Sequence, residues 1–157
     1  MTQVKASGLT MVLLTGGEPL LQPDAVALLE ILLTHGYTCL LETNGSVPVQ
    51  TVPSRVIKIL DWKTPGSGYP DSFCVENLKW IGEQDQIKFV ITSRRDYIWA
   101  MEKVHQHRLE ALVQVIFSPA AGMLQPVTLA NWLMEDKPRI RLQIQLHRFL
   151  YGDKKGV

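Results

Sequence analysis

Cysteine is scarce in this sequence, because the 157 residues contain only two, Cys39 and Cys74. They lie far apart and match none of the close spacings that zinc or iron–sulfur ligands show. The sequence therefore predicts no metal site. We expect both residues to be free thiols in a reducing cytoplasm.

An excess of charge of one sign is also lacking, since 16 Lys and Arg residues oppose 15 Asp and Glu residues. A formal charge of +1 gives no global attraction to nucleic acid or to a membrane surface. No apolar run reaches the about 20 residues of a membrane-spanning helix. The first residues also lack the basic-then-apolar pattern of a signal peptide. We expect neither nucleic acid nor membrane as a partner.

Short apolar runs alternate with amphipathic segments along the chain, whose length suits one domain. We expect strands at residues 11–15, 38–43, 56–62, 86–91, 111–117 and 139–145. Helices are expected at residues 24–34, 72–82, 96–107 and 126–135. Strands that alternate with helices indicate parallel βαβ units, so the predicted fold class is α/β.

Polar clusters lie at the ends of several predicted strands. They are Thr15-Gly16-Gly17-Glu18, Glu42-Thr43-Asn44, Asp61-Trp62-Lys63 and Ser118-Pro119. The carboxyl ends of parallel strands meet at one edge of a sheet, where α/β proteins bind ligands. The sequence therefore predicts a ligand site at this edge.

The first cluster follows an apolar run that we interpret as a buried strand. Gly16 and Gly17 let the backbone turn tightly and approach a ligand closely. Glu18 places one carboxylate on that turn, which suits an amino group. The alternative is a tight turn that carries a solvated glutamate.

The next clusters allow both functional and structural interpretations. A carboxylate at Glu42 suits paired hydroxyls such as those of a ribose, although Asn44-Gly45 is ordinary turn chemistry. Strand alternation puts Asp61 and Lys63 on the same face, where they also suit a structural ion pair. Lys88 has the alternative of extending to the surface.

Histidine and tryptophan give weaker signals. His105 and His107 fall at the end of a predicted helix, and we expect them on a solvated face. His147 follows the last predicted strand, where a lone histidine is more often structural than functional. Tryptophans 62, 80, 99 and 132 are expected in the core and at interfaces.

Together these motifs resemble the radical S-adenosylmethionine (SAM) superfamily, and within it the 7-carboxy-7-deazaguanine synthase (QueE) family of queuosine and deazapurine biosynthesis. The resemblance runs from about residue 12 to residue 157. It rests on residues 14–22, 41–46, 61–68, 88–90, 117–119 and 146–148. Gly-Gly-Glu-Pro is typical of the superfamily. Glu-Thr-Asn-Gly-Ser and Asp-x-Lys-Thr-Pro-Gly-Ser-Gly, in this order, indicate the narrower family.

The resemblance implies a lyase reaction. In complete family members a 4Fe–4S cluster cleaves SAM to a 5′-deoxyadenosyl radical. The radical abstracts hydrogen from 6-carboxy-5,6,7,8-tetrahydropterin. Ring contraction with loss of ammonia, assisted by Mg²⁺, then gives 7-carboxy-7-deazaguanine. SAM and a small pterin are therefore the implied ligands.

The resemblance also implies roles for individual residues, none of them catalytic. The cofactor-binding set is Gly16, Gly17, Glu18, Glu42, Asp61, Trp62, Lys63, Phe117, Ser118 and Pro119. Within it, Gly17 and Glu18 would hold the methionine end of SAM, and Glu42 would lie near the ribose. Thr15, His147 and the terminal carboxylate of Val157 would approach the pterin.

One part of the family pattern has no counterpart here. Family members begin with a strand, a substrate-binding segment and a loop whose three cysteines ligate the cluster. Neither Cys39 nor Cys74 matches those positions, and the Mg²⁺-binding residue of that loop has no match either. We therefore expect one truncated domain over residues 1–157, a partial TIM-like (βα)6 barrel without its first βα unit.

Such a chain is expected to hold neither cluster nor Mg²⁺ and to be inactive by itself. Its open edge strand would favour a homo-oligomer. The alternative function is that of a cluster-free SAM- or nucleotide-binding module, or of a protein-interaction remnant.

Overall fold

The computed structural model describes residues 4, 6–146, 150 and 152. Its strands are β1 (Met11–Leu14), β2 (Thr38–Thr43), β3 (Ile57–Asp61), β4 (Gln86–Ile91), β5 (Gln114–Pro119) and β6 (Ile140–Leu142). Its α-helices are α2 (Ala25–Thr34), α3 (Arg94–Gln106) and α4 (Pro126–Asp136). Short 3₁₀ helices are η1 (Pro19–Leu21), η2 (Pro65–Ser67), η3 (Val75–Lys79) and η4 (Leu109–Ala111). None of the described helices is long and apolar enough to cross a membrane.

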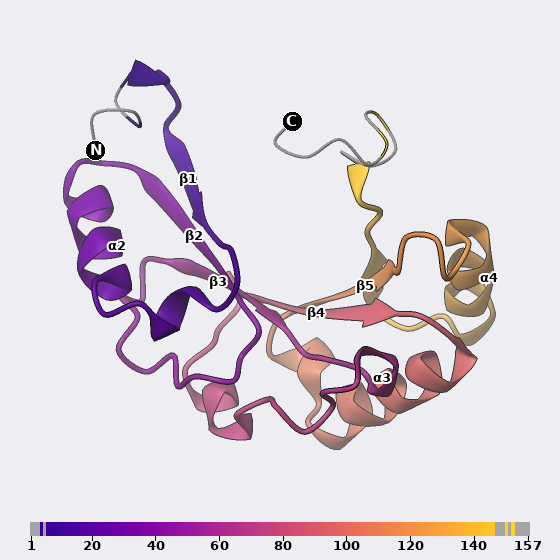
Figure 1. The fold of residues 1–157 in the computed structure, drawn as a ribbon. Helices are drawn as coiled ribbons and strands as arrows, with labels where there is room; N and C mark the ends of the chain where they lie inside the picture. Colours follow the sequence, from indigo (N-terminus) through magenta and orange to yellow (C-terminus); the bar gives the residue numbers. More distant parts are fainter. Residues whose placement is uncertain (1–3, 5, 147–149, 151, 153–157) are drawn as a thin grey trace.

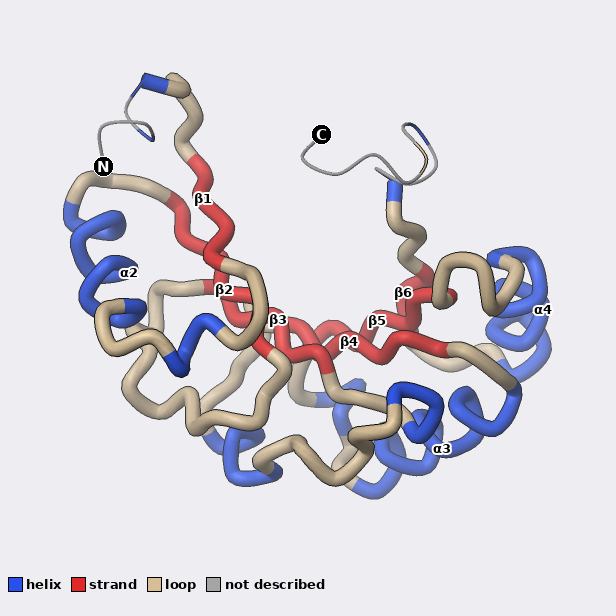
Figure 2. The backbone as a smooth tube through the Cα atoms, in the orientation of Figure 1, coloured by secondary structure: helices blue, strands red, loops and turns tan. Residues whose placement is uncertain are grey.

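The six strands form one sheet in the order β1-β2-β3-β4-β5-β6, and each strand pairs in parallel with the next. The sheet curves strongly, and the helices cover its outer side (Figures 1 and 2). In the part of the chain that the structure describes, β1 and β6 do not pair, so the curve stays open. The predicted α/β class and the partial barrel of parallel strands are confirmed.

The core lies between the sheet and the helices, in two buried clusters. Strand alternation decides which side chains enter it. In β2, Cys39 and Leu41 are fully buried beneath α2, whereas Leu40 and Glu42 lie on the other face and are partly exposed. The inner face of the sheet is therefore the less buried one, and it carries Glu42, Asp61 and Lys88.

The edge strand β1 departs from the predicted buried strand. Met11 is 57% exposed and Leu13 is 46% exposed, while Val12 and Leu14 pack against the cluster beneath α2. Among the described residues β1 has a neighbour on one side only, β2, and no element covers its inner face. The interpretation of this segment as a buried strand was wrong for half of its side chains.

Two helix boundaries differ from the prediction because of local capping. α3 begins at Arg94 instead of residue 96, since the Ser93 side chain accepts a hydrogen bond from the Asp96 amide and caps the helix. Of the helix predicted at residues 72–82, only the 3₁₀ turn η3 forms. The Asn77 side chain of η3 bonds to the backbone of Gly45 and Val49, which holds the turn against a loop.

The fifth strand lies later in the chain than predicted. η4 occupies Leu109–Ala111, where the start of a strand was expected. Arg108 precedes η4 with a positive φ of 51°, and the buried Leu109 anchors the turn. As a consequence Ser118 and Pro119 belong to β5 itself and do not follow it.

Candidate functional site

The turn after β1 is shaped by two glycines in the left-handed region. Gly16 has a φ of 103° and Gly17 a φ of 54°. A Cβ placed on either residue would meet no heavy atom within 4 Å. Conformation, not crowding, requires glycine here. The space beside both residues is open to a ligand.

Glu18 ties this turn to the end of β2. Its Oε1 accepts hydrogen bonds from the Leu20 amide at 3.1 Å and from Thr43 Oγ1 at 2.8 Å. Its Oε2 accepts from the Asn44 amide at 2.8 Å. A carboxylate has about four acceptor positions, so a position remains for a further donor. The solvated-glutamate alternative is wrong, because Glu18 is fixed between two strand ends.

Glu42 and Lys88 form an ion pair on the inner face. Lys88 Nζ, on β4, donates to Glu42 Oε1, on β2. The two side chains are 19% and 30% exposed, so the ammonium is partly buried against the sheet instead of extending into solvent. Sequence reasoning missed this contact, since nothing in the sequence shows that Lys88 reaches across β3.

Asp61 and Lys63 lie on one face, as strand alternation predicted, and Lys63 Nζ donates to Asp61 Oδ2 at 2.7 Å. The other oxygen, Oδ1, is buried and accepts no hydrogen bond from the described residues. A buried acceptor without a partner costs about 1–3 kcal/mol. The ion pair therefore provides a donor for Oδ2 only, and a donor group of a ligand would provide one for Oδ1.

Trp62 and Phe117, both predicted to line the cofactor cleft, point to the opposite side of the sheet. Trp62 is 3% exposed and its ring stacks on Phe73 with centroids 4.0 Å apart. Phe117 is fully buried and contacts Tyr97 of α3. Only the backbone of these two residues is available at the inner face. Ser118, next along β5, alternates to that face.

The remaining predicted site residues do not lie together on the inner face. Thr15 is exposed directly after β1 and lines a mostly apolar hollow of about 540 Å³ between β1 and α2. Pro119 ends β5 in register with Ile91. His147 and Val157 lie outside the described residues. The structure thus brings Gly16, Glu18, Glu42 and Asp61 to the same edge of adjacent strands β1–β3.

Asp96 connects the turn after β3 to the start of α3, a role that the sequence did not predict. Its Oδ1 accepts from the Gly66 amide at 2.9 Å, and its Oδ2 accepts from Thr92 Oγ1 at 2.5 Å. Burial raises the pKa of this carboxyl, but hydrogen bonds from Thr92, Gly66 and Thr64 outweigh it and hold the pKa below its ordinary value. The Ser93-x-x-Asp96 capping pattern was the available sequence signal.

The histidines at the end of α3 differ from each other. His105 is exposed, as predicted. His107 is half-buried with its ring 5.5 Å from that of Trp62, so the expectation of a solvated face was wrong. Burial, and then the nearby Lys103 ammonium, lower the pKa of His107. A neutral imidazole against the aromatic core is the consequence.

The two cysteines do not form a ligand set. Cys39 is buried on the outer side of β2, its Sγ donates to the Tyr37 carbonyl oxygen at 3.7 Å, and burial raises the pKa of the thiol. Cys74 belongs to the loop before η3. No group of three or more His, Cys, Asp or Glu side chains within the described ranges is arranged to hold a metal ion. These residues do not fit an iron–sulfur cluster.

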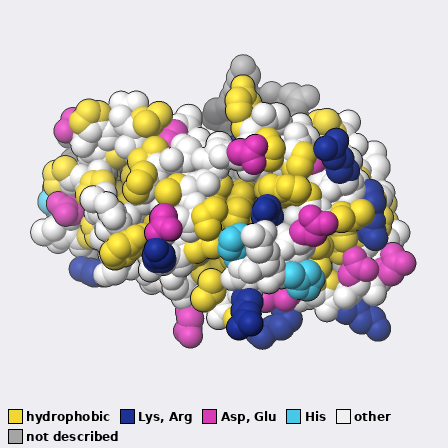
Figure 3. All heavy atoms as spheres, turned by 90° about the horizontal axis from the view of Figure 1, so that it is seen from below, with side chains coloured by type: hydrophobic (Ala, Val, Ile, Leu, Met, Phe, Trp, Pro, Cys, Tyr) yellow, Lys and Arg dark blue, Asp and Glu magenta, His cyan; other side chains and the backbone are white. Residues whose placement is uncertain are grey.

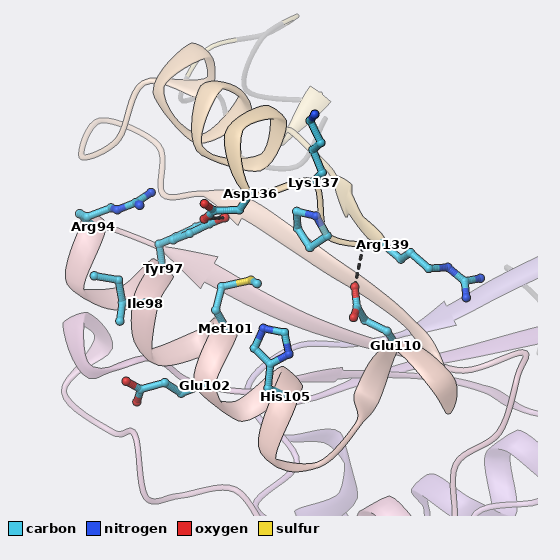
Figure 4. A pocket seen from close by; sticks show the side chains of 11 residues that line it. Arg94, Tyr97, Ile98, Met101, Glu102, His105, Glu110, Asp136, Lys137 and Arg139 are labelled. Atoms are coloured by element: carbon cyan, nitrogen blue, oxygen red, sulfur yellow. Dashed lines mark hydrogen bonds between the residues drawn. The ribbon is translucent and has the colours of Figure 1, made fainter.

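Another hollow, of about 580 Å³, lies on the helical layer and contains none of the predicted site residues. Figure 4 shows Tyr97, Met101 and His105 of α3 facing the turn after α4 across it. Tyr97 Oη donates to Asp136 Oδ2 at 2.7 Å on one of its walls. On the outer face in Figure 3, basic and acidic side chains are interspersed with apolar ones.

Comparison with known proteins gives a consistent result. No family model matches the chain. A 7-carboxy-7-deazaguanine synthase of Koribacter versatilis is 44% identical over 162 residues, which cover 94% of this chain and 72% of the relative. One of Chlorobaculum tepidum is 37% identical over 161 residues, covering 100% of this chain and 73% of the relative.

The crystal structure of QueE from Escherichia coli has the same fold. It matches 92% of this chain with a TM-score of 0.70 at 20% identity. The chain spans 60% of the length of that protein.

Proposed function

Because the chain belongs to the 7-carboxy-7-deazaguanine synthase family, we propose that it binds SAM at the carboxyl ends of β1, β2 and β3. One observation carries this proposal: the buried Oδ1 of Asp61 has no donor among the described residues, on the face where Glu42 also lies. A ligand with several hydrogen-bond donors suits such a set of carboxylates.

The residues of the first turn suit the methionine end of SAM. The open space beside Gly16 and Gly17 admits the backbone of a ligand. The remaining acceptor position of Glu18 suits an ammonium, since charge-assisted hydrogen bonds are the stronger ones. Leu20, Thr43 and Asn44 fix the orientation of the Glu18 carboxylate before the ligand arrives.

The inner face suits the nucleoside. Glu42 accepts from ribose hydroxyls, while Asp61 and Lys63 flank the same ligand. Trp62 and Phe117 contribute backbone only, and Ser118 and Pro119 of β5, both buried, are assigned to the same site. We assign Thr15, His147 and Val157 to the pterin side. Together with a reduced cluster, bound SAM supplies radical chemistry in this family, and these residues bind, orient and exclude water.

This chain does not hold the cluster in our proposal, so its residues by themselves do not complete the synthase reaction. The buried, hydrogen-bonded Cys39 and the distant Cys74 support this view. The second candidate is a cluster-free module that binds SAM or a nucleotide, which the donor-free Oδ1 of Asp61 also favours. A protein-interaction remnant is the remaining alternative.

Anaerobic purification followed by iron and sulfide assays tests the proposal together with SAM calorimetry. We expect measurable SAM binding and, after reconstitution, no stoichiometric cluster by Mössbauer or EPR spectroscopy. A site-ligated 4Fe–4S cluster that survives desalting would contradict the cluster-free assignment. Absence of SAM binding at millimolar ligand would contradict the proposed site.

We also propose a cytoplasmic protein with small-molecule ligands only. The near-balanced charge of +1 and the mixed charges on the face in Figure 3 support the exclusion of nucleic acid and membrane as partners. We further propose a homo-oligomer, for which the open edge described above is the reason.

A further inference from the structure

Lys88 occupies an unusual place on the inner face. Its register neighbour on β3 is Asp61, whose buried Oδ1 lacks a donor in the described part of the chain. The Lys88 ammonium nevertheless reaches past β3 to Glu42 on β2. Asp61 is left to Lys63, through its Oδ2.

This arrangement gives each carboxylate one ammonium. Lys88 engages Oε1 of Glu42, and Lys63 engages Oδ2 of Asp61. The second oxygen of each carboxylate receives no hydrogen bond from the described residues. Two acceptors therefore remain on one face, each held by an ion pair on its other oxygen.

The Glu42–Lys88 pair is held by partial burial. Its side chains are 30% and 19% exposed, whereas those of the surface pair Glu76–Lys79 are 71% and 68% exposed. Long side chains in a solvated pair keep their rotamer freedom, and such pairs contribute little. A pair that lies against the sheet fixes the direction of its carboxylate, which is the requirement for recognising hydroxyl groups.

We propose that Lys88 is a positioning residue that orients the Glu42 carboxylate toward the vicinal diol of a bound nucleoside. This inference rests on the proposed function. It adds a residue on β4 to the set of ligand-determining side chains. It also predicts that recognition of the diol, and not of the base, depends on the Lys88 charge.

The test compares adenosine with 2′,3′-dideoxyadenosine, both uncharged, by NMR titration of the whole chain. The readout is the ratio of the two affinities, which reports the diol alone. We expect the unmodified protein to prefer adenosine about ten-fold, the effect of one charge-assisted hydrogen bond. Lys88→Met should abolish the preference without changing the affinity for the dideoxynucleoside, and Lys88→Arg should restore it.

Two further variants keep the inference falsifiable if Lys88→Met does not fold. Glu42→Gln should lose the same preference, and so should Lys88→Gln, which removes the charge but keeps a polar side chain. Lys79→Met removes an exposed ion pair away from the inner face and should leave the ratio unchanged.

The outcomes separate the inference from the proposed function. A preference for adenosine that persists in Lys88→Met overturns the role of Lys88 and leaves the nucleoside site standing. A protein that binds neither nucleoside nor SAM overturns both.

Discussion

At the scale of single residues, the Glu18 carboxylate has two roles, one in the structure of the first turn and one in the proposed binding of the ligand. Three donors from the chain fix it between the first turn and the end of β2. Ligand binding would use what remains of its acceptor capacity. A substitution here therefore changes both the stability of the turn and the affinity of the site, and the two effects need separate measurements.

Glu18→Ala should weaken SAM binding by about ten-fold or more, because a charge-assisted contact contributes about 1.5–3 kcal/mol. It should also lower the melting temperature, since Thr43 and Asn44 lose an acceptor. Calorimetry measures the affinity. Thr43→Val is the matched comparison: it removes one of the three donors but keeps the carboxylate, so it should weaken SAM binding less than Glu18→Ala does. Equal affinity in Glu18→Ala and the unmodified protein would refute the assignment.

Asp96 gives a pH-dependent prediction. Its folded pKa is lowered, so its stabilising contribution is present above the unfolded value of about 3.9 and is lost as pH falls through the folded value. Asp96→Asn should therefore cost about 1–3 kcal/mol at pH 7 and progressively less below about pH 4. Urea unfolding of both proteins at pH 7 and below about pH 4 measures the difference in free energy of unfolding. A cost that does not change with pH would show that the carboxylate charge is unimportant.

At the scale of elements, the turn between β3 and β4 connects the candidate site to the helical layer. η2 directly follows the Asp61–Lys63 pair, and its Gly66 amide donates to Asp96 at the start of α3. A Cβ on Gly66 would lie 2.2 Å from Thr92 Oγ1 and 2.5 Å from Asp96 Oδ2. The close contact of turn and helix allows only glycine at this position.

Gly66→Ala should destabilise the protein by about 1–3 kcal/mol, the usual cost of overpacking a buried contact. Chemical denaturation measures this free energy of unfolding. Gly82→Ala is the control, since a Cβ there meets nothing within 4 Å and its φ is not positive. Equal stability of the two variants would mean that the turn moves freely against α3.

At the scale of the whole molecule, the unpaired edge of β1 is the feature that most affects self-association. β1 exposes Met11 and Leu13 on its inner face, and its outer side borders the apolar hollow lined by Leu14, Leu28 and Ile31. Among the described residues its free backbone edge has no strand partner. Unpaired strand groups beside apolar surface favour self-association.

We therefore predict a dimer or larger species at micromolar concentration. Leu13→Lys, which puts a charge on the edge strand, should shift the population toward monomer. Val127→Lys on α4, 64% exposed and far from β1 in Figure 1, should leave the assembly unchanged. Light scattering distinguishes the species. A monodisperse monomer before any substitution would contradict the role of the edge.

The sequence by itself determined the α/β class with parallel strands, from the alternating elements, and the family, from its motifs; the partial barrel followed from the family resemblance. β2 and β4 have the predicted bounds of residues 38–43 and 86–91 at both ends, because their alternating apolar residues are bounded by turn-forming neighbours. The motif residues at the strand ends were found for the same reason: backbone direction alone brings the carboxyl ends of parallel strands together.

Only the tertiary structure decided where the side chains of these motifs point. Phe117, which the family resemblance put in the cofactor cleft, belongs to the core, because a one-residue difference along a strand changes the face of the sheet. For Trp62 the sequence had allowed both the core and the cleft, and the structure places its ring in the core. The Lys88–Glu42 pair joins residues far apart in sequence, and it depends on the register of three strands. Local sequence fixes the conformation of a segment, whereas contacts across strands depend on pairing that no single segment encodes.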